Sequence, residues 1–406
     1  MNQRSVITLF MMALLLGLGS TLSACKKKKK SIALDVTPPQ FIALKTPRIT
    51  PSFSTTPTFT VRQVDAGDTV RLFKSADCAE DSLLGSGVAG VGQTNVDITL
   101  TELSDLGTYP IYANRTNAAG TTSVCSAQLT SYQLIGCPDG LYAHVEGNPD
   151  LGTDAFCVMV TEARQGEGNI PVAQYAGTPW TSVNAINAKA ACKSIPVEGG
   201  TCDLISNPQW MTLARDIEAT DANWSGGEVG VGVLNRGHSD DDPANALSIT
   251  YPADPWDGTG QTSTTWHQKR THILSNGEEI WDLAGNVREW ADWETGGDTF
   301  MVGPNTCPYD GKSPYSFVCE DLAPNDYLPG NPAGIDPAEY TASNYNIGTI
   351  YGTNEETRAA GSGGAALRGG YWGPGSVAGL FCLDLRFRPT FTHYSFGFRC
   401  VCLVGL

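Results

Sequence analysis

The pattern of apolar and polar residues divides the chain into a part with short strands and a part with helices and long loops. Between residues 51 and 135, apolar and polar positions alternate with a period of two, as in half-buried strands, and turn residues separate the alternating stretches. The clearest stretches are Thr58–Val61, Thr69–Phe73, Val96–Leu100 and Tyr109–Ala113. Short strands at this spacing predict a β-sandwich.

Two helical patterns follow in the second part of the chain. The first covers residues 181–193, with Thr181 or Ser182 as the N-cap. Its expected apolar face is formed by Val183, Ile186 and Ala190. The second begins at Ser206, which forms a capping box with Gln209. Its expected apolar face is formed by Trp210, Leu213, Ala214 and Ile217. After about residue 225 there is little periodicity, which predicts long loops.

The N-terminus has the composition of an export signal. Arg4 precedes an almost entirely apolar stretch at residues 5–19, which has the length of a signal peptide and is short for a membrane-spanning helix. The sequence Leu22-Ser23-Ala24-Cys25 resembles a bacterial lipobox, in which the chain is cut before the cysteine and the thiol is lipidated. The alternative is an ordinary secretory signal peptide followed by an unrelated cysteine.

The lipobox resemblance implies that residues 1–24 are removed and that Cys25 anchors the protein in a membrane. Lys26–Lys30 follow directly, and cations beside a lipid favour contact with anionic headgroups. A solvated spacer would have the same composition. The segment 25–50 is therefore interpreted as lipid anchor, lysine run and linker. No aspartate follows Cys25, so the outer membrane or cell surface is the expected location.

Net charge and cysteine content limit the possible functions. The formal charge of -16 argues against a nucleic-acid partner. Twelve cysteines in an exported chain predict disulfides, and no C-x-x-C metal pair is present. Three pairs are expected from position: Cys78 with Cys125, Cys137 with Cys157, and Cys307 with Cys319. Without Cys25 an odd number of cysteines remains, and Cys382 is the expected unpaired thiol.

Two parts of the sequence resemble known families. Residues 51–135 resemble bacterial Ig-like domains, mainly in Ala66–Phe73 and Gly107–Tyr109. Residues 137–406 resemble the formylglycine-generating enzyme family, a branch of the C-type lectin fold. This second resemblance is carried by the stretch from Cys192 through Leu204–Trp210 to Arg215, by Ile280–Trp290, and by Leu367–Trp372 with Gly397–Cys400. The expected fold is multidomain: an Ig-like β-sandwich followed by an α+β C-type lectin-like fold.

The second resemblance also implies roles for individual residues. It pairs Cys192 with Cys400, and Cys202 then pairs with Cys402 by elimination. Asn286 and Glu289 are possible ligands of a structural calcium ion, although calcium needs several hard oxygens and the sequence shows few. No other cofactor is expected. Three tryptophans are expected in the core rather than on a ligand surface: Trp281, Trp290 and Trp372.

The sequence departs from the family where its oxidases carry paired cysteines that bind copper. Those cysteines lie five residues apart shortly after the Arg-Gly-Gly stretch, whereas here Cys382 has no partner at that spacing. The five histidines show no metal-ligand spacing. We therefore do not expect an enzyme, and a copper-dependent oxidase acting on protein cysteines stays as the alternative function. A structural envelope protein is a second alternative.

The segment from Tyr371 to Phe396 has an unusual composition, because it lacks Lys, Glu, Gln, Met and Asn. If both adenines of an AAC asparagine codon are replaced at random, the resulting codons encode nearly the same set of amino acids that this segment contains. The variable region, about 368–400, resembles that of proteins diversified by retroelements that mutate adenines. Template asparagines are expected at Gly373, Pro374, Val377, Cys382, Asp384, Arg386, Phe387, Phe391, His393, Tyr394 and Ser395.

The expected function is therefore a surface-displayed lipoprotein whose C-terminal domain binds a protein or carbohydrate through this diversified surface. Tyr371 and the eleven positions above are the expected ligand contacts, since exposed aromatic and arginine residues often dominate binding. Alternation predicts that Leu383 and Leu385 point inward and that Asp384 and Arg386 point outward. The alternative for this segment is a plain core strand followed by an aromatic-rich loop.

Overall fold

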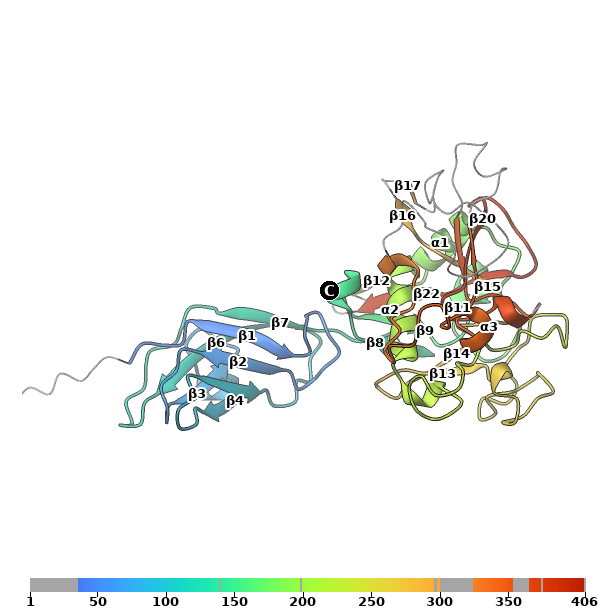
Figure 1. The fold of residues 1–406 in the computed structure, drawn as a ribbon. Coiled ribbons are helices and arrows are strands. Elements are labelled where there is room, and N and C mark those ends of the chain that lie inside the picture. Colours follow the sequence, from blue (N-terminus) through green and yellow to red (C-terminus); the bar gives the residue numbers. More distant parts are fainter. Residues whose placement is uncertain are drawn as a thin grey trace, which may run out of the picture. The chain divides into compact units, whose positions relative to one another are not determined.

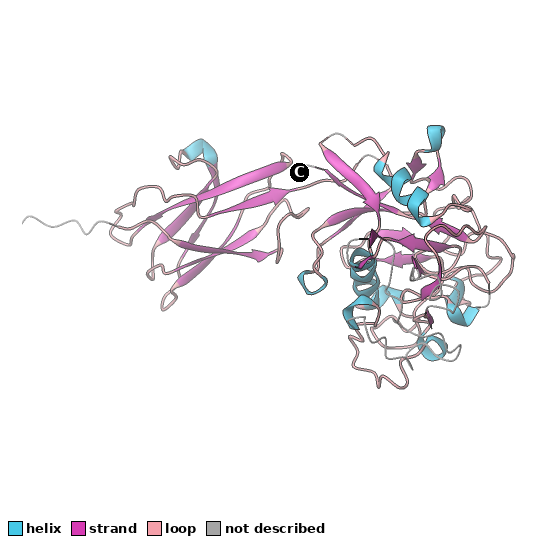
Figure 2. Ribbon diagram, turned by 90° about the horizontal axis from the view of Figure 1, so that it is seen from above, coloured by secondary structure: helices cyan, strands magenta, loops and turns pink. Residues whose placement is uncertain are grey.

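The computed structural model describes residues 36–138, 140–197, 199–295, 298–299, 324–352, 365–373 and 375–404. The signal peptide, Cys25, Lys26–Lys30 and the Cys307–Cys319 pair lie outside these residues, so the expectations about them stay predictions. The described chain is mostly β-structure with few helices (Figure 2). Residues Val36–Leu406 group into one unit, and the boundary expected between residues 135 and 137 stays a prediction.

The N-terminal strands form two sheets, with the strand orders β1-β2-β5 and β4-β3-β6-β7 (Figure 1). All pairings between neighbouring strands are antiparallel. The strands are β1 (Phe41–Thr46), β2 (Thr58–Arg62), β3 (Thr69–Phe73), β4 (Leu83–Val88), β5 (Asn95–Thr99), β6 (Gly107–Thr116) and β7 (Thr130–Leu134). The four alternating stretches of the sequence correspond to β2, β3, β5 and β6. Both sheets contribute to one buried cluster, which includes Phe59, Leu72, Ile98 and Ile111.

The C-terminal strands form two larger sheets and three hairpins. The sheets have the orders β12-β22-β9-β8 and β18-β20-β19-β15-β21, and the hairpins are β10-β11, β13-β14 and β16-β17. The strands are β8 (Tyr142–Val145), β9 (Phe156–Met159), β10 (Arg164–Gln165), β11 (Pro171–Val172), β12 (Gly200–Leu204), β13 (Thr271–Ile273), β14 (Glu279–Trp281), β15 (Arg288–Ala291), β16 (Glu294–Thr295), β17 (Asp298–Thr299), β18 (Ile350–Tyr351), β19 (Ala365–Arg368), β20 (Leu383–Phe387), β21 (Phe396–Phe398) and β22 (Cys400–Val404).

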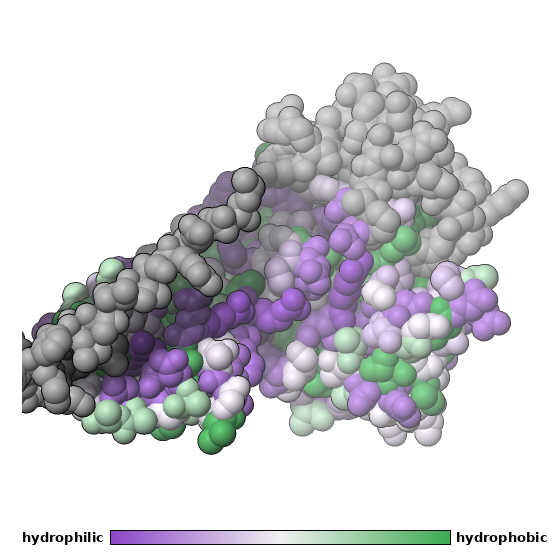
Figure 3. Space-filling model, turned by 60° about the vertical axis from the view of Figure 1, so that its left-hand side comes forward, coloured by the Kyte–Doolittle hydropathy of each residue, from purple (hydrophilic) through white to green (hydrophobic). Residues whose placement is uncertain are grey.

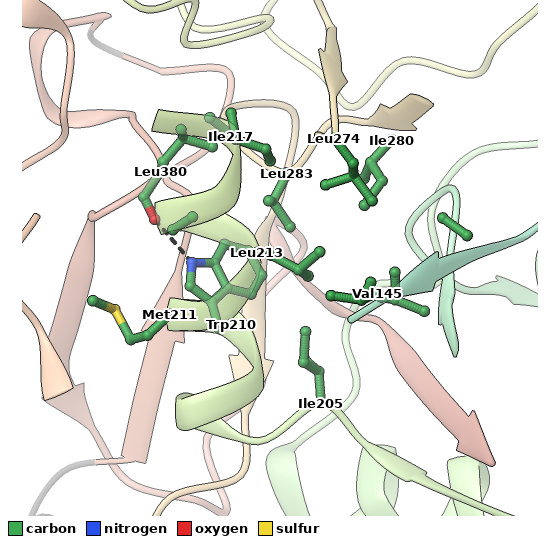
Figure 4. Close-up of a cluster of buried hydrophobic side chains, with 14 of the residues drawn as sticks. Val145, Ile205, Trp210, Met211, Leu213, Ile217, Leu274, Ile280, Leu283 and Leu380 are labelled. Carbon is green, nitrogen blue, oxygen red and sulfur yellow. Dashed lines mark hydrogen bonds between the residues drawn. The ribbon is translucent and has the colours of Figure 1, made fainter. Parts of the chain in front are cut away.

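Helix α2 (Asn207–Glu218) is the centre of the largest hydrophobic cluster. It begins with the predicted capping box, in which the Ser206 hydroxyl accepts from the Gln209 backbone N–H and the Gln209 side chain accepts from the Ser206 N–H. The predicted apolar face is buried. Trp210 lies inside the cluster and donates its indole N–H to the Leu380 carbonyl oxygen over 2.8 Å (Figure 4). This bond links α2 to the loop that precedes β20.

Helix α1 (Ala185–Lys193) differs from its prediction in cap and face, and a short third helix, α3 (Ala342–Tyr345), lies before β18. The N-cap is Asn184, whose side chain accepts from the Asn187 N–H, and not Thr181 or Ser182. Ile186 is 48% exposed, and the buried face consists of Ala185, Ala188 and Cys192. The small residues allow the helix to pack closely against β12.

The structure forms disulfides at four of the five predicted pairs. Cys78 joins Cys125 in the N-terminal sheets, and Cys137 joins Cys157 on β9. The two remaining bridges, Cys192–Cys400 and Cys202–Cys402, tie α1 and β12 to the final strand β22. The fifth predicted pair lies outside the described residues. Each of these two bridges closes a loop of about 200 residues, which strongly restricts the unfolded chain.

The described surface is mainly polar. On the face drawn in Figure 3, hydrophilic residues cover most of the coloured surface and hydrophobic residues form only small groups. Within the described ranges, no helix has both the length and the apolar character needed to cross a bilayer.

Candidate functional site

The described residues among the predicted ligand contacts lie on strand β20 and on two loops of the five-stranded sheet. One loop connects β19 to β20 and the other connects β20 to β21. The first loop starts with Gly369 and Gly370, which have φ values of +80° and +85°. A Cβ atom would lie 2.6 Å from the Leu283 carbonyl oxygen at Gly369 and 2.5 Å from the Ala378 Cα at Gly370. The two glycines are therefore required here, because the backbone has positive φ angles and neighbouring atoms leave no room for a Cβ atom.

Main-chain hydrogen bonds hold the second loop, residues 388–395. The Ser182 N–H donates to the His393 carbonyl oxygen over 3.1 Å, and the Ala185 N–H donates to that of Pro389 over 3.0 Å. Within the loop, the Phe391 N–H donates to the Arg388 carbonyl oxygen. These bonds fix the path of the loop against the start of α1 and do not involve the side chains of the predicted contacts.

Six aromatic side chains from these two loops and from β20 form what we call the aromatic surface. Its members are Tyr371, Trp372, Phe387, Phe391, His393 and Tyr394. Tyr394 is 64% exposed and Phe391 is 42% exposed. The ring centroids of Trp372 and Tyr394 are 5.8 Å apart, those of His393 and Tyr394 are 4.1 Å apart, and those of Phe387 and Phe391 are 4.9 Å apart. Trp372 is mostly buried, as predicted, and its ring packs against that of the exposed Tyr394.

Two arginines and one carboxylate lie under the aromatic surface. Asp384 was expected to point outward, but it is fully buried because both of its oxygens accept hydrogen bonds from Arg386, over 2.8 and 2.6 Å. The Arg288 Nε lies 3.6 Å from the same carboxylate. The Arg288 guanidinium also lies 4.3 Å from the centre of the Tyr371 ring. The simple alternation of β20 fails here because this ion pair holds Asp384 inside.

Three further predicted contacts are also buried, namely Gly373, Cys382 and Ser395. Burial raises the pKa of the Cys382 thiol to about 11, so the thiol stays protonated at neutral pH. The predictions that these residues and Asp384 contact a ligand are therefore wrong for this structure. Pro374 lies outside the described residues, and Val377 is half-buried. The predicted contacts that reach the surface are Tyr371, Val377, Arg386, Phe387, Phe391, His393 and Tyr394.

The histidine of the aromatic surface is held in its neutral form. The His393 Nδ1 lies 2.7 Å from the Ser395 hydroxyl oxygen. Burial, and then the positive charge of Arg288, lower the pKa of His393 from its usual value. Near neutral pH the ring is therefore an uncharged aromatic group.

The residues named as possible calcium ligands take part in a buried polar network instead. Both Glu289 oxygens accept hydrogen bonds from Arg399, over 2.7 and 3.0 Å. The Asn286 side-chain oxygen accepts from the Leu247 N–H, and its amide donates to Glu162. Both residues are therefore engaged by protein partners in this structure, and the binding of a calcium ion stays a prediction. In the part of the chain that the structure describes, no group of three or more histidine, cysteine, aspartate or glutamate side chains is arranged to hold a metal.

The same network contains two more ion pairs that the sequence motifs did not reveal. Arg164 lies 3.2 Å from Glu162, and Arg270 lies 2.6 Å from Asp282. All four side chains are almost completely buried. Burial and the nearby charge of Asp282 raise the pKa of Glu162 well above its usual range. These groups are enclosed by the core and line none of the described pockets.

The described cysteines do not form the thiol pair that an oxidase of the resembled family would need. Cys382 is the one free cysteine in the ranges that the structure describes, and its thiol is buried. Paired thiolates are the ligands that copper(I) prefers, and a single protonated thiol does not replace them.

Comparisons with known proteins found only remote likenesses. No family model and no curated protein matches the chain. Among solved structures, Treponema denticola variable protein 1 is similar at 14% identity and a TM-score of 0.29, over 66% of this chain and 90% of that one. The Major Tropism Determinant I1 variant is similar at 13% identity and a TM-score of 0.28, over 90% of this chain and 85% of that one. Likeness at this level does not establish a shared fold, so a function has to be argued from the residues themselves.

Proposed function

We propose that this protein is a surface-displayed lipoprotein whose C-terminal domain, of C-type lectin-like fold, binds a ligand through the aromatic surface. The observation that carries the proposal is the exposure of Tyr394 and Phe391 in a group of six aromatic rings, whose two halves both pack against the buried ring of Phe396. Exposed aromatic groups cost free energy in water unless a partner covers them, and they dominate many binding interfaces. The ligand is a protein or a carbohydrate on another surface.

We further propose that this surface is diversified by a retroelement that mutates adenines. Two observations support this. The composition from Tyr371 to Phe396 is close to that of randomised asparagine codons. Seven of the predicted contacts reach the surface of a segment whose path is fixed by backbone bonds and glycines. Such positions can change their side chains without removing the contacts that hold the loops.

The test of this part is genomic. We expect the host genome to contain a near-copy of the DNA for residues 368–400 beside a reverse transcriptase gene, with differences concentrated at adenines of the copy. In related strains, variation should be concentrated in the codons of the eleven expected template asparagines, and the codons of the frame residues Arg368–Gly370 and Gly397–Cys400 should stay constant. A complete genome without such a copy would contradict diversification and leave only a ligand-binding lipoprotein.

We also propose that Cys25 carries the lipid anchor. We expect Cys25→Ala to release the protein from membranes or to stop its processing, because the thiol is the attachment point of the lipid. The measurement is membrane fractionation at low and high salt, since high salt weakens the contribution of Lys26–Lys30. A mutant that stays with the membrane at high salt would show that another feature anchors the chain.

A further inference from the structure

The cation under the aromatic surface lacks the hydrogen bonds that a buried arginine normally makes. Arg288 extends from β15, and its side chain is only 9% exposed. Its Nε has no hydrogen-bond partner, and no hydrogen bond from its guanidinium to another described residue is present. Among the described residues, its one ion-pair contact is with Asp384, at 3.6 Å. A guanidinium has five donors, so this group is poorly satisfied by the protein alone.

Of the carboxylates that the structure describes, Asp384 is the one that faces Arg288, at 3.6 Å from its Nε. Both oxygens of Asp384 already accept hydrogen bonds from Arg386. The other titratable groups near Arg288 are His393, Tyr351 and Cys382, and none of them is a carboxylate. A second carboxylate, supplied by a ligand, would therefore give the Arg288 guanidinium the hydrogen-bond acceptors that it lacks.

We infer that Arg288 binds a carboxylate of the ligand, and that this ligand is a protein patch with an aspartate or glutamate next to apolar side chains. This inference rests on the proposed function. The guanidinium fork fits a carboxylate through two parallel hydrogen bonds. The half-buried Tyr371 ring lies over the guanidinium and would therefore adjoin the bound carboxylate. Phe391 and Tyr394 would then cover the apolar neighbours of that side chain.

A protein fits this site better than a carbohydrate. Sugars are recognised through many hydrogen bonds to their hydroxyl groups. The Asp384 carboxylate is a poor acceptor for such hydroxyls, because both of its oxygens already accept hydrogen bonds from Arg386. The exposed part of the surface consists mainly of phenyl and phenol rings, which favour apolar side chains. Aromatic rings surrounding an arginine are also the composition typical of protein-binding hot spots.

The experiment uses the purified full chain in detergent and a random library of displayed peptides about twelve residues long. Peptides selected on the wild-type protein should contain an acidic residue beside an aromatic or aliphatic one. Their Kd should weaken at least about tenfold on Arg288→Met, and equally when the acidic residue of the peptide is replaced by its amide. Combining both changes should add little, because the two groups act as a pair. Arg62→Met, an exposed arginine on β2, is the matched control and should leave binding unchanged.

The outcomes separate this inference from the proposed function. Tyr394→Ala should weaken all selected peptides, and insensitivity to Tyr394 would contradict binding through the aromatic surface. Sensitivity to Tyr394 without sensitivity to Arg288 or to the peptide carboxylate would overturn the inference alone. Tighter, Arg288-dependent binding of oligogalacturonate, an acidic sugar, would overturn the choice of a protein ligand. If Arg288→Met does not fold, the inference is tested by the Kd of the selected peptides for Arg288→Lys and by the Kd of the amide-substituted peptides for the wild-type protein. Both should be weaker if Arg288 binds the peptide carboxylate.

Discussion

Glu289→Ala is expected to destabilise the protein by about 3–5 kcal/mol, because it leaves the buried Arg399 without its counter-charge. Arg399 is fully buried, and Glu289 accepts two of its hydrogen bonds. The remaining partners of Arg399 are backbone carbonyl oxygens, which do not neutralise it. The free energy of unfolding in urea, measured with the disulfides intact, is the observable.

An exposed pair of the same type provides the control. Arg71 and Glu80 form a two-pronged pair in the N-terminal sheets, with a Glu80 side chain that is 76% exposed. Glu80→Ala should change the stability little, since water replaces the lost partner. Replacing both members of the buried pair, as Glu289→Leu with Arg399→Met, should be milder than Glu289→Ala alone. Equal losses for Glu80→Ala and Glu289→Ala would show that burial of the pair does not matter.

Mild acid is expected to destabilise the protein through His272 on β13. Burial lowers the pKa of His272 to about 3, from an ordinary value of 6.5, so the folded protein holds the neutral ring. The unfolded chain takes up a proton below pH 6.5 and the folded chain does not. Stability is therefore fully present above pH 6.5 and falls by about 1.4 kcal/mol per pH unit as the pH decreases toward 3. Between pH 6.5 and 4.5, His272 alone accounts for about 2 kcal/mol.

The measurement is the free energy of unfolding as a function of pH for wild type and His272→Gln. The substitution keeps a donor for the Asn235 carbonyl oxygen, which the His272 Nε2 contacts at 3.3 Å. Its curve should lose the acid slope that His272 contributes. His144→Gln removes an exposed histidine and should keep that slope. The raised pKa of Glu162 acts in the opposite direction, because its protonated folded form is lost as the pH rises. If the free energy of unfolding falls equally steeply with decreasing pH in the wild type and in His272→Gln, the prediction is contradicted.

The parts of the fold that follow from neighbouring residues could be predicted from the sequence. The capping box of Ser206 and Gln209 is local, and α2 begins where it indicates. The alternating strands β2 and β3 have one buried side, so their period is visible. The pairing of Cys78 with Cys125 follows because no other cysteine lies in that region.

The parts that depend on distant residues could not be predicted. The buried side of α1 is chosen by β12, which accepts small residues, and so Ile186 is left in water. The inward turn of Asp384 goes with two hydrogen bonds from Arg386, and with Arg288, which is almost a hundred residues earlier in the chain. Arg288 itself was visible only as one residue of a family-like motif. The aromatic part of the site was predicted because its composition is unusual, and its charged part was missed because the charges meet only in the folded protein.

The backbone bonds between the loop 388–395 and the residues before α1 have a consequence for protein engineering. Since the N–H groups of Ser182 and Ala185 hold the loop by its carbonyl oxygens, the loop behaves as a cassette whose outward side chains can be exchanged. A synthetic library that randomises Phe391, His393 and Tyr394 should yield mostly folded members. The same library at Cys382, Asp384 and Ser395 should yield mostly unfolded ones. A scaffold of this kind separates the residues that confer recognition from those that confer foldability, and new specificities can then be selected without repairing the core.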